Sequence, residues 1–472
     1  MATEHYQNLV IGGGEAGKYL AWTLAKQGQR TAVVERALIG GSCPNIACLP
    51  SKNIIRSAKV ASLVGRAAEF GITTGPVRVD AAGVFRRKQK MVDGLIQMNL
   101  DRYHASGAEL VMGEAQFIGP KTVQAALKSG GSSTMSGDRV FINVGTRASV
   151  PDLPGLVEAK PMTHVEALNL QRLPERLVIL GGGYVALEFA QAMRRFGSRV
   201  VLIHRGPRLL SREDPDISDA LFELMKDEGI EVWLKTDVLK VTGRSGDGLQ
   251  LQVRSADKAD TIEASDILAA VGRTPNTDRL NTDQAGIELD SRGYIRVSEK
   301  LETTAPGVWA LGECAGSPQF THVSFDDYRV VRDNLAGGTR TTRDRLIPYC
   351  LFTDPELAHV GLNESEAKTK GIPYRLAKMP MKSVLRTWTL SETRGFAKAL
   401  VGQDDRLLGF TAFGVEASEM MAAAQTAMIG RMPYTALRDA IFTHPTMAEG
   451  LGALFSNVSP SSVPVSARHE AG

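Results

Sequence analysis

The sequence predicts an α/β protein of about three domains, two of which share one design. The chain has 472 residues, whereas single domains usually span about 100–200 residues. Two segments, which start near residues 8 and 177, repeat the same order of buried strand, glycine-rich turn, helix and strand. From about residue 344 onward, strands and helices alternate with Pro and Gly between them, which predicts a C-terminal α+β domain.

The first repeat carries glycines at the spacing of a dinucleotide site. Gly12 permits a tight turn, Gly14 lets the backbone approach a pyrophosphate, and Gly17 lets the helix pack on the strand. The next strand ends in Glu35, whose carboxylate can accept hydrogen bonds from ribose hydroxyls. Strand, glycines, helix and acid together predict a Rossmann-like domain that binds a dinucleotide.

The second repeat predicts a second Rossmann-like domain. Its motif residues are Gly181, Gly183 and Ala186. The position that matches Glu35 holds His204, and Arg205 follows it. A carboxylate at this point favours a free 2′-hydroxyl, whereas cationic groups suit a 2′-phosphate. The sequence therefore favours NADPH over NADH, and the alternative is that both residues are solvated loop charges.

Cys43 and Cys48 are two of only four cysteines in the chain, and they lie just after the first repeat. A disulfide across so short a loop stabilises little, about 2 kcal/mol against about 4.7 kcal/mol for a 100-residue loop. Residues 49–52 lead into a helix predicted over about 53–63, and a helix N-terminus stabilises thiolate. We interpret the pair as a working dithiol rather than as two buried free thiols. A metal site is disfavoured because no further His or Cys cluster supplies ligands.

Composition excludes several classes of protein. A net charge of +3 and an aromatic content of 6% give no electrostatic footprint for nucleic acid. The sequence has no run of about eighteen apolar residues, and its N-terminus does not read as a leader peptide. A close cysteine pair in a cysteine-poor chain is typical of a reducing compartment. We therefore expect a cytoplasmic protein that binds neither nucleic acid nor membrane.

Further motifs complete a family pattern over about residues 5–458. They are the segments 113–117, 272–276, 310–314 and 444–449. With these, the sequence resembles the class I pyridine nucleotide-disulfide oxidoreductases, which include glutathione reductase, dihydrolipoamide dehydrogenase and mercuric reductase. Segments 181–188, 318–321, 326–329 and 441–445 are most similar to two branches of the family. These branches are the mercuric-reductase-like proteins and the bacterial reactive-chlorine-resistance flavoproteins, which reduce hypothiocyanous acid.

The resemblance implies that electrons pass from NADPH through FAD to a disulfide between Cys43 and Cys48. Cys48 would be the sulfur next to the flavin, and Cys43 the thiol that attacks the substrate. Lys52 would lie near the reactive flavin nitrogen, with Glu188 as its partner. The implied cofactor contacts also include Ser42, Lys52, Ala115, Gly145 and Glu313 for FAD, and Gly272 for NADPH.

His444 and Glu449 resemble the acid/base dyad of the family, which reaches the dithiol of the other subunit in a homodimer. The histidine would take or give the proton as Cys43 attacks or leaves, and the carboxylate would fix the tautomer. The His444–Pro445 bond can be cis, since cis peptides occur chiefly before proline. The resemblance thus implies an active site shared between two subunits.

The chain departs from the family pattern at several positions. Glu313 stands where an aspartate usually accepts from the ribityl chain of the flavin. Ala47 replaces a glycine between the cysteines, and Pro44 is unusual after the first. Cys314 and Cys350 are single and distant in sequence, so we expect both to be structural.

The landmarks also set the expected domains. These are an FAD-binding domain over 1–150 and 271–343, an NAD(P)H-binding domain over 151–270, a dimerisation domain over 344–458 and a disordered tail over 459–472.

The leading functional hypothesis is an NADPH-dependent, FAD-containing disulfide reductase that acts on a small oxidised sulfur species or an electrophile. Mercuric reductase is the second hypothesis, although such enzymes usually have a C-terminal cysteine pair and tend to carry tyrosine at the position of His444. The last cysteine here is Cys350. Arg205 disfavours dihydrolipoamide dehydrogenase activity, while glutathione reductase activity stays open. A non-catalytic redox sensor is disfavoured, since it needs neither Lys52 with Glu188 nor an acid/base dyad.

Overall fold

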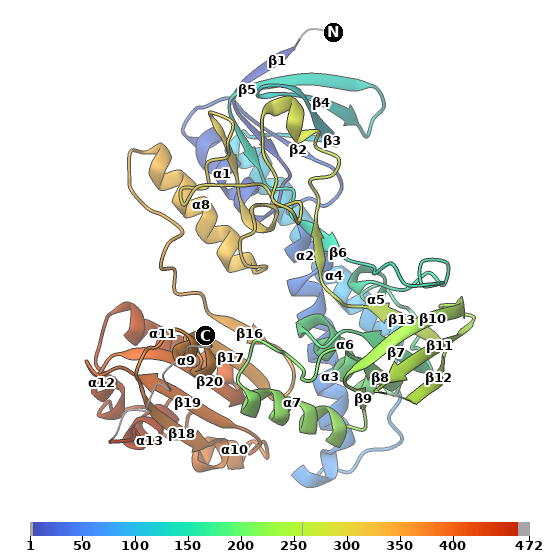
Figure 1. Ribbon diagram of the computed structural model, residues 1–472, viewed down its shortest axis with the longest axis vertical. Coiled ribbons are helices and arrows are strands. Elements are labelled where there is room, and N and C mark those ends of the chain that lie inside the picture. The colour runs from blue at the N-terminus through green and yellow to red at the C-terminus, as the bar shows by residue number, and fades with distance from the viewer. Residues whose placement is uncertain (1–2, 257, 461–472) are drawn as a thin grey trace, which may run out of the picture.

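The computed structural model describes residues 3–256 and 258–460. Its sheets lie apart in Figure 1, with the N-terminal sheet at the top, the central sheet at the lower right and the C-terminal sheet at the lower left. The expected boundaries near residues 150, 270 and 343 fall in the connections between these sheets. Among the described residues, no helix is both long and apolar enough to cross a membrane.

The N-terminal sheet is parallel at its centre and is built from both ends of its domain. Its parallel strands are, in spatial order, β3 (Glu109–Gly119), β2 (Thr31–Glu35), β1 (Glu4–Ile11), β5 (Ser132–Ile142) and β15 (Val308–Ala310). The outer halves of β3 and β5 pair antiparallel with β4 (Thr122–Leu127). Helices α1 (Glu15–Lys26) and α8 (Thr321–Leu335) pack together on this sheet, next to the long α4 (Ala81–Ser106).

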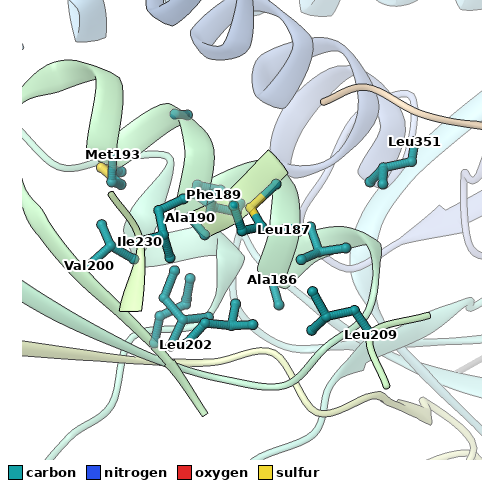
Figure 2. Packing of buried hydrophobic residues seen from close by; sticks show 14 of the residues in the cluster. Ala186, Leu187, Phe189, Ala190, Met193, Val200, Leu202, Leu209, Ile230 and Leu351 are labelled. Atoms are coloured by element: carbon teal, nitrogen blue, oxygen red, sulfur yellow. The ribbon is translucent and has the colours of Figure 1, made fainter. Parts of the chain in front are cut away.

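The central sheet repeats the parallel design. Its strands are, in spatial order, β13 (Asp266–Ala269), β7 (Arg176–Leu180), β8 (Arg199–Ile203) and β9 (Glu231–Trp233). Helices α6 (Tyr184–Phe196) and α7 (Pro215–Asp227) cover one face. Figure 2 shows how Leu187 and Ala190 of α6 meet Leu202 of β8 in this core. The antiparallel strands β10 (Thr236–Arg244), β11 (Gly248–Ser255) and β12 (Lys258–Ala264) flank the sheet.

Two short strands mark where the chain leaves and re-enters the N-terminal domain. Strand β6 (Thr146–Ala148) pairs antiparallel with β14 (Arg273–Pro275). The short helix α5 (His164–Ala167) follows on the side of the central domain, where a capping box at Thr163 fixes its start. The two crossings therefore lie together, as expected for a domain inserted into another.

The C-terminal domain is an antiparallel sheet covered by helices. The strand order is β16 (Tyr349–Leu351), β17 (Glu356–Gly361), β20 (Leu407–Gly414), β19 (Phe396–Val401) and β18 (Arg375–Pro380). Its helices are α9 (Glu364–Thr369), α10 (Leu385–Thr389), α11 (Ala417–Ile429), α12 (Tyr434–Arg438) and α13 (Gly450–Ser456). Of the tail predicted over 459–472, residues 461–472 lie outside the described residues. Ser459 is not part of a free tail, because its backbone N–H donates to Leu376 O of β18.

The predicted α/β class and both strand–glycine–helix–strand repeats are confirmed, but one helix begins earlier than expected. Helix α3 (Cys48–Gly65) starts at Cys48 rather than at residue 53. Pro50 lies in its first turn, where N–H groups have no partner within the helix, so the missing donor costs nothing there. A second short helix, α2 (Ser42–Ile46), precedes it and contains Pro44. Both cysteines therefore lie on helices.

Candidate active site

The two cysteines face each other across the junction of α2 and α3. Ala47 separates the helices with a non-helical backbone (φ −135°, ψ −107°), which turns the chain between Cys43 and Cys48. Both cysteines are free thiols in this structure. Cys48 Sγ lies 3.1 Å from Thr321 Oγ1, the first residue of α8. Thr321 belongs to the family motif at 318–321, but no pattern in the sequence predicts its contact with Cys48.

The surroundings give the two thiols opposite acidities. The hydrogen bond from Cys43 lowers the pKa of Cys48 to about 6, with further lowering by Thr321 and by the charge of Lys52, against the opposing effect of burial. The same hydrogen bond, together with burial, raises the pKa of Cys43. The reduced pair therefore holds one thiolate at neutral pH, on Cys48, where the N-terminus of α3 also favours negative charge.

Lys52 lies one helical turn after Cys48 and pairs with Glu188 of α6. Lys52 Nζ lies 2.9 Å from Glu188 Oε1 and 2.8 Å from Oε2. The carboxylate, only 8% exposed, also accepts from the Phe352 N–H at 3.0 Å, and the ammonium group sits 4.7 Å above the Phe352 ring. This arrangement holds a positive charge beside the dithiol. It also connects the N-terminal, central and C-terminal domains, which supply Lys52, Glu188 and Phe352 in turn.

The first glycine loop forms a cradle that side chains would fill. A methyl group on Gly14 would lie 2.4 Å from Asn143 Oδ1, and one on Gly12 would lie 2.5 Å from Asn143 O. Helix α1 begins after Gly14 without a side-chain cap, and Asn143 Oδ1 accepts from the Gly17 N–H at 3.0 Å. Uncapped N–H groups at a helix start suit a pyrophosphate, so these residues fit the dinucleotide predicted for them.

Glu35 is held more firmly than the sequence suggests. Its carboxylate, predicted to face a ribose, accepts from the N–H groups of Gly13 (2.7 Å), Ala37 (2.7 Å) and Leu38 (2.8 Å). Beside it, the buried Tyr103 hydroxyl has no partner among the described residues and would lie 3.2 Å from a methyl group on Gly13. An unpartnered buried hydroxyl at this point fits a bound ribose or phosphate oxygen. No sequence motif points to Tyr103.

The remaining expected FAD contacts lie around the same cradle. Ser42 begins α2, Ala115 is buried in β3, and Gly145 has a positive φ of 63°. One oxygen of Glu313 accepts from the hydroxyl of Thr146 and from Arg273 Nε, the latter at 3.2 Å. Those contacts leave only the other oxygen of Glu313 for the flavin contact that its aspartate counterpart makes in the family.

The second glycine loop is built like the first. Helix α6 begins after Gly183 without a side-chain cap, and a methyl group on Gly181 (φ 131°) would lie 2.3 Å from Ala270 O. Ala186 is buried against the sheet, while Gly272 (φ 138°) has open space around it. The loop can therefore accept a second pyrophosphate.

His204 occupies the place that Glu35 takes in the first repeat. A methyl group on Gly182 would lie 2.7 Å from its ring, just as one on Gly13 would lie 3.3 Å from the carboxylate of Glu35. Burial lowers the pKa of His204, and the charge of Arg205 lowers it further. The charged form of His204 is therefore disfavoured in this structure, and a contact of His204 with a 2′-phosphate stays a prediction. The exposed Arg205 is left to supply the positive charge.

The predicted dyad forms, but away from the dithiol of the same chain. His444 Nδ1 lies 2.8 Å from Glu449 Oε2, and the His444–Pro445 bond is cis. The imidazole is 63% exposed, whereas Glu449 Oε1 is buried without a partner among the described residues. In Figure 1 the segment between α12 and α13 lies at the lower left, well apart from α2 and the start of α3.

The other two cysteines differ in their surroundings. Cys314 is fully buried under the N-terminal sheet, and its thiol donates to the carbonyl of Leu311. Cys350 lies in β16, close enough to Glu188 and Lys52 for their charges to affect its pKa. Burial raises the pKa of both thiols. Both therefore stay protonated near neutral pH.

Family models match nearly the whole chain. The model described as pyridine nucleotide-disulphide oxidoreductase matches residues 6–327. The model described as the dimerisation domain of the same family matches residues 347–454. The chain therefore belongs to the pyridine nucleotide-disulphide oxidoreductase family.

The chain is similar to particular members of this family. The probable pyridine nucleotide-disulfide oxidoreductase RclA of Escherichia coli (strain K12) is 36% identical over 460 residues, which cover 96% of this chain and 99% of the relative. The mercuric reductase of Staphylococcus aureus is 32% identical over 449 residues, which cover 94% and 81%. A solved structure of the Cu(II) complex of the HOCl-induced flavoprotein disulfide reductase RclA from Escherichia coli matches with a TM-score of 0.88 and 35% identity, covering 97% and 100%.

These comparisons confirm the resemblance to the family and to its mercuric-reductase-like and reactive-chlorine-resistance branches. The protein is a flavoprotein disulfide oxidoreductase whose cofactors are FAD and NAD(P)H, and it has the dimerisation domain of the family.

Proposed function

We propose that the protein is an NADPH-dependent reductase of a small oxidised sulfur species, working in the cytoplasm as a homodimer through a Cys43–Cys48 dithiol. One observation carries the proposal. The thiolate-stabilised Cys48 lies at the start of α3, one turn before a lysine that is locked to Glu188. An ion pair with a largely buried carboxylate contributes little net stability, and charges that shift the pKa of a neighbouring group are typical of functional sites.

The residues divide the work between the two thiols. When bound, FAD would supply a two-electron path from the nicotinamide to sulfur. Cys43 attacks the sulfur of the substrate, so that a mixed disulfide forms and the leaving group departs with the electron pair of the broken bond. The Cys48 thiolate then attacks Cys43 Sγ, which releases the reduced substrate thiolate and restores the Cys43–Cys48 disulfide. Two electrons from NADPH reopen that disulfide, and Lys52 stabilises the negative charge next to it.

His444 and Glu449 manage the protons in this scheme, from the partner subunit. The neutral imidazole accepts the Cys43 proton as the thiol attacks, and Glu449 fixes the tautomer through Nδ1. The exposure of the imidazole supports a role toward a second chain, as does a fully exposed Ile441 three residues before it. The active site is then complete only in the dimer.

The substrate is tested by an acceptor screen with NADPH and the FAD-loaded protein. Glutathione disulfide, lipoamide, hypothiocyanous acid, quinones and mercuric thiolate are compared in wild type and in Cys43→Ser. We expect rapid, saturable turnover with a small oxidised sulfur species and none in the variant. Full activity of Cys43→Ser with every acceptor would contradict the dithiol mechanism.

Mercuric reduction is the second candidate, favoured by the mercuric reductases among the relatives. No cysteine follows Cys350 of β16 in the sequence printed above, which disfavours the handover of metal by a cysteine pair. We therefore expect only slow turnover with mercuric thiolate. A fast, saturable rate with this acceptor would reverse the ranking.

A further inference from the structure

A buried carboxylate outside the dithiol site has an unused oxygen. Glu213 lies between β8 and α7 and is only 7% exposed. Its Oε1 accepts from the Tyr349 hydroxyl at 2.8 Å, while Oε2 is buried without a hydrogen-bond partner among the described residues. A buried polar atom left unpaired is costly, so its retention needs an explanation.

Glu213 sits at the end of an aromatic cluster formed by Tyr184, Phe320, Tyr349 and His359. The Tyr349 ring stacks with His359 at 4.9 Å and with Phe320 at 6.0 Å between centroids. Tyr184 meets Phe320 and Tyr349 edge-on, at 6.3 and 6.1 Å. The cluster therefore joins the N-terminal, central and C-terminal domains at one point.

The same cluster borders the dithiol site on one side and the second glycine loop on the other. Tyr184 is the first residue of α6, directly after that loop, and lies one turn before Glu188 on the same helix face. Phe320 directly precedes Thr321, whose hydroxyl contacts Cys48. A ligand that reaches from the glycine loop to the Lys52–Glu188 pair therefore passes Tyr184.

We propose that Glu213 is a positioning residue that controls how firmly Tyr184 is held beside the path of the nicotinamide. This inference rests on the proposed use of NADPH. The Tyr184 hydroxyl lies close enough to Glu213 for a hydrogen bond between the two side chains. When Glu213 is ionised, Oε2 requires a donor, and in this proposal the Tyr184 hydroxyl supplies it. When Glu213 is neutral, this hydrogen bond is weaker, and the Tyr184 side chain moves aside more easily for the nicotinamide.

Glu213 changes its charge near neutral pH. Burial raises the pKa of Glu213 to about 7, although the hydrogen bond from Tyr349 lowers it. Burial and the charge of Glu213 raise the pKa of Tyr184, so that its hydroxyl keeps the proton that it would donate. The other titratable or charged groups that face Glu213 and Tyr184 are Asp214, Glu366 and Lys398 around the first, and Cys350 and Arg212 around the second.

The test uses the full-length, FAD-loaded protein and two variants at this site. Glu213→Gln keeps an acceptor for Tyr349 but cannot ionise, and Tyr349→Phe removes the hydrogen bond that lowers the pKa. Glu223→Gln, an exposed carboxylate in the neighbouring helix, is the matched control. Infrared difference spectra report the C=O band of a protonated carboxyl group, and flavin fluorescence reports the dissociation constant for NADP⁺, both between pH 5 and pH 9.

We expect a carboxyl band that disappears with a midpoint near pH 7 in wild type and in Glu223→Gln, is absent in Glu213→Gln, and shifts to higher pH in Tyr349→Phe. We also expect Glu213→Gln to bind NADP⁺ as wild type does at pH 6 and up to about tenfold more tightly at pH 8.5, the factor expected for one hydrogen bond to a charged group. Taking the ratio to wild type at each pH cancels titration of the 2′-phosphate.

A ratio that stays constant across this range, or wild-type spectra without the band, would overturn the inference. The proposed function would stand in that case, since it fails on a different result, namely the absence of flavin reduction by NADPH in wild type.

Discussion

Cys48 carries the charge of the reduced dithiol because three neighbours favour its thiolate. Cys43 and Thr321 donate toward its sulfur, and Lys52 supplies a positive charge. Cys43 is left protonated, with burial and the neighbouring thiolate both raising its pKa. This asymmetry supports the proposal that Cys48 faces the flavin and that Cys43 attacks the substrate.

Reduced protein should therefore show a thiolate at unusually low pH. We expect the ultraviolet absorbance of thiolate to rise with a midpoint near pH 6 in wild type and to lack this step in Cys48→Ser. Cys43→Ala should move the midpoint upward, because it removes the largest cause of the lowered pKa. Cys350→Ser is the control and should leave the curve unchanged, since burial raises the pKa of that thiol. A midpoint near the ordinary thiol value in wild type would contradict the assignment.

Arg205 should decide between the two nicotinamide cofactors. Burial lowers the pKa of His204, so we expect Arg205 to supply the positive charge for a 2′-phosphate. We expect Arg205→Ala to lower kcat/KM for NADPH on the order of tenfold and to leave NADH unchanged, as the loss of one charge-assisted hydrogen bond predicts. Arg208→Ala, which removes a looser ion pair with Asp219, is the control. Equal losses with both cofactors would show that Arg205 acts only on the fold.

At the scale of elements, we expect the uncapped start of α1 to hold the pyrophosphate of FAD. A methyl group on Gly14 would collide with Asn143, whose side chain also holds the Gly17 N–H. We expect Gly14→Ala to reduce the flavin content per chain about tenfold, because overpacking here costs about 1–3 kcal/mol. Gly94→Ala, in open space on α4, should keep its flavin and stabilise the fold by about 0.5–1 kcal/mol. Undiminished flavin in Gly14→Ala would place the cofactor elsewhere.

The elements that the sequence predicted well are those with local signals. The two glycine repeats are recognised by the spacing of their glycines. The pairing of Lys52 with Glu188 was implied by the resemblance to the family and not by any local pattern, and the structure contains this ion pair. The start of α3 at Cys48 was missed because a proline in a first turn looks like a break in the sequence.

Other site residues had no local signal at all. Thr321 reaches Cys48 from 273 positions away, and Glu213 meets Tyr349 from 136 positions away. Such contacts depend on how separate domains pack, which periodicity and spacing do not encode. Tyr103, whose hydroxyl has no partner within residues 3–256 and 258–460, likewise had no local signal.

At the scale of the whole molecule, the dyad and the dithiol should meet only between chains. A heterodimer of Cys48→Ser with His444→Ala contains one site with an intact dithiol facing an intact histidine. We therefore expect about half of the wild-type activity per heterodimer, while both homodimers are inactive. The activity is measured on heterodimers purified with two different tags. If the site lay within one chain, the heterodimer would be as inactive as its parents.

The proposed mechanism requires electrons to pass from the flavin to a disulfide between Cys43 and Cys48. Anaerobic reductive titration tests this transfer most directly. The FAD-loaded, oxidised protein should take up two equivalents of a two-electron reductant per chain, one for the flavin and one for the disulfide, with long-wavelength absorbance after the first. Cys48→Ser should take up one equivalent without that absorbance. A wild-type protein that is fully reduced by a single equivalent would contradict the account.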